Sequence, residues 1–233
     1  MKIKETWNKV SYNSFINYLK SIGDSKTKEF NSRIIDTKYE IIGIKTPVIK
    51  ALAKDIAKSD IKSFLECVQD NYYEEVLIHG LVLSYIKDVD EFLNYFNKFI
   101  LLIDNWALCD TCINSYKIMK NNDLSDKASL LIYSNNEFLS RVGYVMYLNH
   151  YLDDDHINDI IHLSMIPSDY YYVNMAIAWL LSCCFINYRV FVLDLLKSKE
   201  LSPFVQNKTI SKIRESLKVS KEDKELVKSF KIQ

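Results

Sequence analysis

The sequence predicts an all-α protein in which helix pairs stack as an α-α superhelix, a HEAT-like repeat solenoid. The 233 residues include only four Gly and three Pro, roughly 3 % where about 12 % is ordinary, and a sheet protein of this size needs many more turn residues. Apolar residues recur at helical spacing between short polar connections, and stacked helix pairs of this kind line a concave groove. We expect one domain over residues 1–233, with a compact helical bundle as the alternative architecture.

The elements follow in order from these patterns. The first helix is expected over residues 5–22, and a turn around Gly43 precedes the second, which Thr46 caps and Pro47 opens at a position where its missing N–H costs nothing. Ser202 and Pro203 mark a late helix start in the same way. The remaining helices are predicted over residues 60–69, 72–87, 89–102, 105–120, 124–132, 136–151, 155–165, 169–187, 188–198, 203–217 and 220–230.

Charge is spread unevenly along a chain whose net charge is zero. Residues 1–62 hold 13 Lys/Arg and 7 Asp/Glu, residues 63–196 hold 7 and 18, and residues 197–233 hold 10 and 5. Basic ends can contact a polyanion at two points, although each can also be an ordinary solvated helix face. The acidic middle argues against strong nonspecific affinity for nucleic acid, because that affinity comes mainly from neutralising phosphates.

Membrane, metal and redox roles are not expected. No run of 18 uncharged apolar residues exists, and the charged N-terminus lacks a signal-peptide core, so the sequence favours a cytoplasmic protein. The pair Cys109 and Cys112 forms a CxxC, but no second CxxC completes a zinc site. Three histidines six residues apart scatter around a helix instead of sharing one face. We therefore expect no metal or cofactor, and a monomer.

The segment Leu102–Asp110 carries the strongest functional signal. Trp106 and Asp110 stand four residues apart in a predicted helix, so their side chains share one face. That face also carries apolar Ile103 and Ile113, and a carboxylate on an apolar stripe is costly to bury unless it is paired or used. The alternative is an Asp at the edge of the stripe, bonded to a neighbouring helix end.

Two later residues attract attention for similar reasons. Arg141 lies at the inward edge of its predicted helix, where a guanidinium needs a carboxylate or phosphate partner; the alternative is an Arg whose aliphatic stem lies along the apolar surface while its head reaches water. Trp179 shares a face with Met175, Ala176 and Cys183. Taken alone, Trp179 is better explained as a core residue than as part of a site.

Together, these segments resemble the AlkD-like DNA alkylation repair proteins, which are HEAT-like-repeat DNA glycosylases. The resemblance spans roughly residues 39–185 and rests on the order of five motifs: Ile42–Pro47 with Lys50, Tyr73–Glu75 with Gly80, Ile103–Asp110, Arg141 and Trp179. Near the C-terminus, Asn207–Ser216 resembles one branch of the family. No single motif is specific, but their order and spacing jointly are.

The resemblance implies an enzyme that hydrolyses the N-glycosidic bond of alkylated, cationic purines in double-stranded DNA. It implies that Asp110 is the catalytic carboxylate, that Trp106 and Trp179 form an aromatic wall against the deoxyribose, and that Arg141 holds a backbone phosphate. It also implies DNA contacts by Lys45, Lys50, Arg141, Lys208 and Lys212. The site residues are expected to converge on one concave surface.

This chain departs from the family pattern at three places. Ile34 stands at or near the position of an early aromatic residue that packs near the lesion, and Asn149 and Ser182 stand near positions where basic residues follow the Arg and the second Trp. The predicted groove is therefore less cationic than that of the family's archetype. A noncatalytic HEAT-like DNA-binding protein and a protein-interaction solenoid are the alternative functions.

Overall fold

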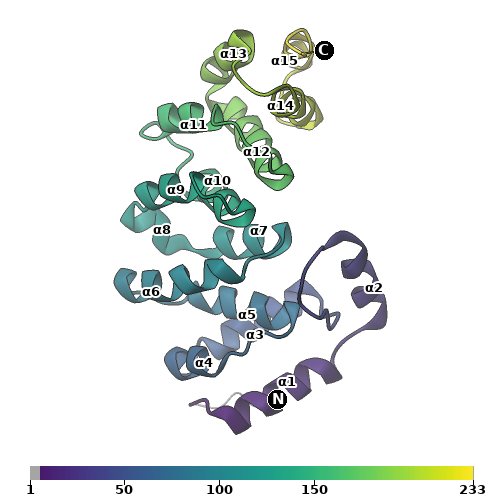
Figure 1. The fold of residues 1–233 in the computed structure, drawn as a ribbon, viewed down its shortest axis with the longest axis vertical. Helices are drawn as coiled ribbons and strands as arrows, with labels where there is room; N and C mark the ends of the chain where they lie inside the picture. The colour runs from purple at the N-terminus through teal and green to yellow at the C-terminus, as the bar shows by residue number, and fades with distance from the viewer. Residues whose placement is uncertain (1–5, 233) are drawn as a thin grey trace. The chain divides into compact units, whose positions relative to one another are not determined.

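The computed structural model describes residues 6–232, and within them the ordered elements are helices, with one isolated bridge between Glu40 and Tyr72. The α-helices are α1 (Lys9–Ser21), α2 (Ser25–Ile34), α3 (Thr46–Ile56), α4 (Ile61–Cys67), α5 (Tyr73–Leu83), α6 (Val89–Phe99), α7 (Trp106–Ser115), α8 (Lys117–Asn122), α9 (Ser125–Ile132), α10 (Glu137–His150), α11 (Ile157–Ser164), α12 (Tyr171–Asn187), α13 (Arg189–Ser198), α14 (Pro203–Glu215) and α15 (Lys221–Lys228), and Ile100–Leu102 form a 3₁₀ turn (Figure 1). The predicted all-α class is confirmed.

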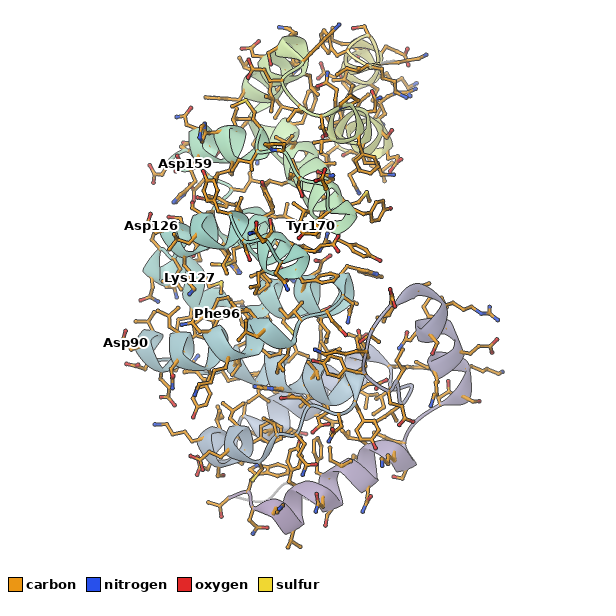
Figure 2. All side chains as sticks on the ribbon, in the orientation of Figure 1. Asp90, Phe96, Asp126, Lys127, Asp159 and Tyr170 are labelled. Atoms are coloured by element: carbon orange, nitrogen blue, oxygen red, sulfur yellow. The ribbon has the colours of Figure 1, made fainter. Side chains whose placement is uncertain are left out.

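Contacts divide the chain into two compact units, one ending at Asn122 and one beginning at Asp123. In the first unit α3, α5 and α7 pack side by side as a row, and α6 packs against α5. All eleven residues of α5 are buried, as expected for a helix that is covered on every side. Phe96 of α6, which is fully buried, belongs to the same core (Figure 2).

The second unit repeats this plan. Its row consists of α10, α12 and α14, and each of these helices has at least one partner beside it: α9 against α10, α11 and α13 against α12, and α15 against α14. The 17 residues of α12 include nine buried ones. Helix pairs packed in rows are the arrangement of an α-α superhelix, and each unit shows it.

Several predicted helix boundaries were wrong: the helix expected over residues 72–87 ends at Leu83, for example, and the one expected over 89–102 ends at Phe99. Two further misses have a clear structural basis. The helix expected over residues 105–120 is two helices, because the backbone turns at Tyr116, whose side chain is fully buried and donates a hydrogen bond of 2.9 Å to Gly80 O. Thr46 does not cap α3: Lys45 occupies the N-cap without a side-chain bond, and Pro47 stands in the first turn. Proline is tolerated there because the first N–H groups of a helix have no partner within it.

Helix α2 was also not predicted from the sequence. The Asp24 carboxylate caps it by accepting from Thr27 N at 2.8 Å. No residue of α2 is buried, so the apolar stripe by which helices are recognised in sequence is absent. Phe30 and Ile34, one turn apart, are 61 % and 44 % exposed.

Two buried carboxylates at the start of α5 fix the connections around it. Glu74 is 0 % exposed and accepts from the backbone N–H groups of Ile42, Gly43 and Ile44 at 2.7–3.0 Å. Gly43 adopts a φ of +99°, a backbone conformation that residues other than glycine rarely adopt. The adjacent Glu75 accepts from the Tyr12 hydroxyl and from backbone N–H groups of residues 69, 71 and 72. The bonds from the Tyr12 hydroxyl and from the N–H groups of Gly43 and Ile44 satisfy donors that are buried.

Replacing Glu74 with alanine should destabilise the protein strongly. Three backbone N–H groups would lose their acceptor, and one such buried group costs about 1–3 kcal/mol, so we expect the free energy of unfolding to fall by about 3 kcal/mol or more in urea denaturation. Glu66→Ala is the matched control, since Glu66 is exposed and makes no hydrogen bond or ion pair within the described part of the chain; its effect should stay within about 0.5 kcal/mol. Equal effects would refute the anchoring role of Glu74.

Candidate functional site

Trp106 and Asp110 lie one turn apart at the start of α7, and both are partly exposed. The helix begins at Trp106 because Asn105 caps it: the Asn105 side-chain oxygen accepts from Leu108 N at 3.0 Å, and the residue is 1 % exposed. Ile113 is buried on the same helix, whereas Ile103 precedes the helix in extended conformation. The shared face of Trp106 and Asp110 is thus confirmed, while the part of the stripe assigned to Ile103 was wrong.

The indole of Trp106 is held by the end of α2. Its Nε1–H donates to Ile34 O at 3.2 Å. Ile34 is the residue that replaces the family's early aromatic in the resemblance, and its backbone lies directly beside the candidate site. Because Ile34 is 44 % exposed, it adds an accessible apolar side chain near Trp106.

Asp104 ties the segment after α2 to the start of α7. Its carboxylate accepts from Thr37 Oγ1 at 2.9 and 3.0 Å, from Lys38 N at 2.7 Å and from Asn105 Nδ2 at 2.7 Å. Tyr39 adds a hydrogen bond from its hydroxyl to Leu102 O at 2.7 Å. Burial, reinforced by the negative charge of Asp104, raises the pKa of Tyr39 above its usual value, so the hydroxyl keeps the proton that it donates.

These positioning residues were not identified as such from the sequence. Asp104 and Asn105 were noted only as part of the Ile103–Asp110 motif, and no role was predicted for Thr37 or Tyr39. The bonds from Thr37 and Tyr39 to the start of α7 span 67 and 63 residues, and periodicity, which is a local property, cannot detect contacts at such separation.

Lys45 and Lys50 are both exposed, Lys45 at the N-cap of α3 and Lys50 near the middle of that helix. Lys45 immediately follows the Ile42–Ile44 segment that Glu74 holds, so its backbone is fixed although its side chain is free to reach solvent. Lys45 also lowers the pKa of Asp24, after the larger effect of the hydrogen bonds from Thr27. The two lysines thus belong to the first unit together with Trp106 and Asp110.

Arg141 and Trp179 belong to the second unit, on the neighbouring helices α10 and α12. Arg141 is only 5 % exposed, and its Nη1 donates to Tyr172 O at 2.6 Å. Trp179 is partly exposed and lies one turn before Cys183. The predicted inward position of Arg141 agrees with its burial, and Trp179, with its partial exposure, is available to solvent on one side.

Lys208 and Lys212 lie one turn apart on α14, which Ser202 and Pro203 start as predicted. Both are partly exposed. Burial raises the pKa of the Cys183 thiol, and the charges of Lys212 and Lys218 oppose that shift. Helix α14 packs directly against α12, which carries Trp179. The second unit therefore presents an indole and basic side chains on adjoining helices.

Metal and redox chemistry find no support in these side chains. Within residues 6–232 no group of three His, Cys, Asp or Glu side chains is placed to hold a metal ion. Cys109 and Cys112 are both buried, and burial raises the pKa of Cys112 far above that of a free thiol, which makes a reactive thiolate unfavourable. The described helices include none that is both long and apolar enough to span a membrane.

Fold and site together define a helical-pair protein that presents tryptophan, carboxylate and basic side chains on its row helices. The sequence matches the family model described as DNA alkylation repair enzyme over residues 15–218. Because this match covers most of the chain, the protein belongs to the DNA alkylation repair enzyme family, which supports a role in DNA repair. No curated protein matches the chain.

Replacing Asp104 with alanine should loosen the segment after α2 from α7. The variant loses the acceptor for Thr37 and for Lys38 N–H, and hydrogen bonds to a charged group are worth about 1.5–3 kcal/mol. We expect faster amide hydrogen exchange at Lys38 and a lower free energy of unfolding. Asp36→Ala is the control, because Asp36 is exposed in the same segment and makes no hydrogen bond in the described structure. Unchanged exchange at Lys38 in the Asp104 variant would contradict this positioning role.

Proposed function

We propose that the protein is an alkylpurine DNA glycosylase that hydrolyses the N-glycosidic bond of cationic, alkylated purines in double-stranded DNA. The observation that carries the proposal is the pair of Trp106 and Asp110, one turn apart and partly exposed on a helix start that Asp104 and Asn105 hold in place. Membership in the DNA alkylation repair enzyme family supports the same substrate class.

The proposed reaction needs a carboxylate but little assistance from a general acid. Alkylation at N3 or N7 makes the purine cationic and thus a good leaving group, so little acid assistance is needed. As the glycosidic bond breaks, the sugar becomes an oxocarbenium-like cation, which a preorganised anion stabilises. Asp110 would supply that anion and position the attacking water. The water oxygen joins the anomeric carbon, the purine departs as a neutral base with the bonding electrons, and one proton of the water is released to solvent.

In this proposal, the aromatic side chains provide the wall of the site. The π faces of Trp106 and Trp179 would contact the deoxyribose and favour its developing positive charge. The hydrogen bond from Trp106 Nε1 to Ile34 O fixes one of these rings before substrate arrives. Trp106 and Trp179 come from different units, so their joint action on one substrate remains a prediction.

We propose that Arg141 holds a phosphate of the DNA backbone. Because the residue is 5 % exposed and bonded to Tyr172 O, a phosphate reaches it only if its rotamer or its surroundings change when DNA binds. Lys45, Lys50, Lys208 and Lys212 would add exposed or partly exposed contacts that need no such change.

The decisive variant is Asp110→Asn, which keeps the shape of the side chain and removes its charge. We expect release of 3-methyladenine or 7-methylguanine from methylated DNA, measured in single turnover, to fall by about 10²–10³-fold. DNA affinity should hold or rise slightly, because an anion near phosphates is repelled by them.

Asp90→Asn is the matched control for charge. Asp90 is exposed on α6, from which its labelled side chain projects outward (Figure 2), and it makes no ion pair in the described residues. This variant should excise normally. Undiminished excision by Asp110→Asn would remove that residue from the mechanism, whereas no excision by the unaltered protein, combined with DNA binding, would favour the noncatalytic DNA-binding function.

DNA binding itself is tested by Lys208→Gln/Lys212→Gln. If each lysine neutralises one phosphate, the slope of log affinity against log salt should become shallower by about 1.8, since each contact contributes about 0.9. Lys221→Gln/Lys224→Gln removes the same charge from α15 in the same unit and should change the slope little. Absence of any salt-dependent DNA binding in the unaltered protein would reject both DNA-based functions and leave the protein-interaction solenoid.

A further inference from the structure

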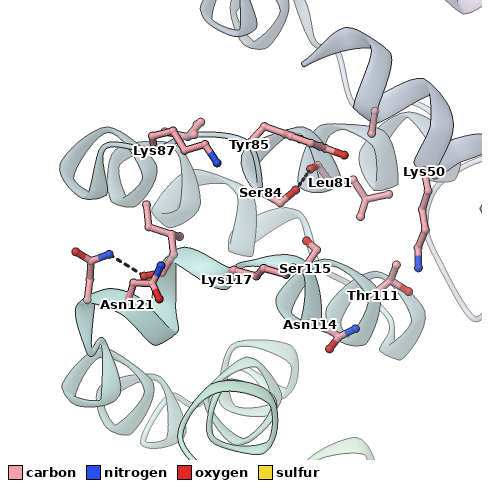
Figure 3. Close-up of a pocket in the computed structure, with 14 residues that line it drawn as sticks. Lys50, Leu81, Ser84, Tyr85, Lys87, Thr111, Asn114, Ser115, Lys117 and Asn121 are labelled. Atoms are coloured by element: carbon pink, nitrogen blue, oxygen red, sulfur yellow. Dashed lines mark hydrogen bonds between the residues drawn. The ribbon is translucent and has the colours of Figure 1, made fainter. Parts of the chain in front are cut away.

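The first unit contains a pocket next to the face of Trp106 and Asp110, with Asn114, one turn after Asp110 on α7, among its lining residues. It has a volume of about 540 Å³ and is lined by residues of α3, α5, α7 and α8 and of the connection after α5 (Figure 3). Neither Trp106 nor Asp110 lines it. Small-molecule sites in proteins typically have volumes of about 300–1,000 Å³, so the pocket has room for a ligand of nucleotide size.

The charged side chains of the pocket are all positive. Lys50, Lys87 and Lys117 line it from three different segments, and its lining includes no Asp or Glu. In the described part of the chain none of the three ammonium groups lies within ion-pair distance of a carboxylate, whereas other lysines of the same unit do have such partners. Figure 3 shows Lys50 and Lys87 with their amino groups directed toward the α7–α8 side of the pocket.

Neutral donors accompany these charges. The side chains of Tyr85, Thr111, Asn114 and Asn121 line the pocket, and none of them makes a side-chain hydrogen bond to another described residue. Ser84 and Ser115, by contrast, already donate to the backbone at Leu81 O and Cys112 O. The unpaired hydroxyl and amide groups can therefore donate to the oxygens of an anion.

The positions of these lysines could also be explained by interactions with helix dipoles, but that explanation accounts for only part of the positive charge. Lys87 and Lys117 follow the C-terminal ends of α5 and α7, where a cation interacts favourably with the helix dipole by about 0.3–1 kcal/mol. Each helix end carries only about half a negative charge, so two ends offset about one of the three ammonium charges. Lys50 comes from the middle of α3, where this explanation does not apply.

We propose that this pocket binds a phosphate ester of nucleotide size. The lysines and neutral donors would hold the phosphate, while Leu81, Tyr85 and Ile118 offer apolar and aromatic surface to a base. Two sources carry this chemistry: a free nucleotide and the phosphorylated end of a DNA strand. The proposal does not depend on excision, and Lys50 is the single residue that it shares with the proposed DNA contacts.

The test compares two double variants of the full chain by isothermal titration calorimetry. Lys87→Gln/Lys117→Gln removes two pocket charges. Lys54→Gln/Lys120→Gln removes two exposed, unpaired charges from α3 and α8 that do not line the pocket. The probes are adenosine 5′-monophosphate and a short single-stranded DNA with either a 5′-phosphate or a 5′-hydroxyl.

Binding of a phosphate-bearing probe should weaken about tenfold or more in the pocket variant and stay within about twofold in the control, because charge-assisted contacts to phosphate are strong. If the pocket variant loses binding of adenosine monophosphate, the ligand of the site is a free nucleotide. If it loses binding of the 5′-phosphorylated strand alone, the ligand is a DNA end. Either result supports the site. Failure of both probes to bind the unaltered protein, or equal weakening in the two variants, overturns it.

Excision of methylated purines separates this inference from the proposed function. The pocket variant should excise at the rate of the unaltered protein, since neither substituted lysine belongs to the proposed catalytic site. Loss of phosphate binding with normal excision supports a second site, and an unaltered protein that binds the nucleotide without excising purines supports the pocket while contradicting the glycosylase proposal. Equal loss of excision and of phosphate binding in the pocket variant would overturn the pocket as a separate site.

Discussion

Carboxylates that accept backbone N–H groups hold the connections of the first unit in place; Glu74 and Glu75 are buried, and Asp104 is partly exposed. Glu74 binds three consecutive N–H groups at the Gly43 turn, Glu75 binds three more just before α5, and Asp104 binds the segment after α2. A helical chain offers such connections no sheet to pair with. Because a buried N–H group without a partner costs about as much as a lost hydrogen bond, the helix positions depend on these side chains.

This constraint reaches the candidate site through Asp104. The carboxylate fixes the segment after α2 against the start of α7, and Ile34, the last residue of α2, provides its carbonyl to the Trp106 indole. Electrostatic stabilisation of a developing cation requires that the anion and its neighbours be placed before the reaction begins. A helix start tied down on one side by a cap and on the other by Asp104 would meet this requirement for the role proposed for Asp110, which lies one turn further along.

Positive charge is concentrated at two places in a chain whose middle stretch is acidic. The stretch of residues 63–196 is strongly acidic, with 18 Asp/Glu against 7 Lys/Arg, and such a surface repels DNA unless local cations are concentrated. Lys208 and Lys212, one turn apart on α14, form one concentration, and the three lysines of the pocket, which have no ion-pair partner among the described residues, form another. Both lie on row helices or directly after them, where their side chains extend from fixed backbone.

The sequence by itself determined the all-α class, most helices and the shared face of Trp106 and Asp110, because the Gly/Pro shortage, apolar periodicity and i,i+4 spacing are local properties of a helix. It missed α2, none of whose residues is buried, and the break at Tyr116, whose buried hydroxyl bonds to Gly80 O. Only the tertiary structure brought Asp104 to Thr37 and three lysines to one pocket. Contacts between residues so far apart in the chain form when helices pack, and no local pattern encodes which side chains will meet.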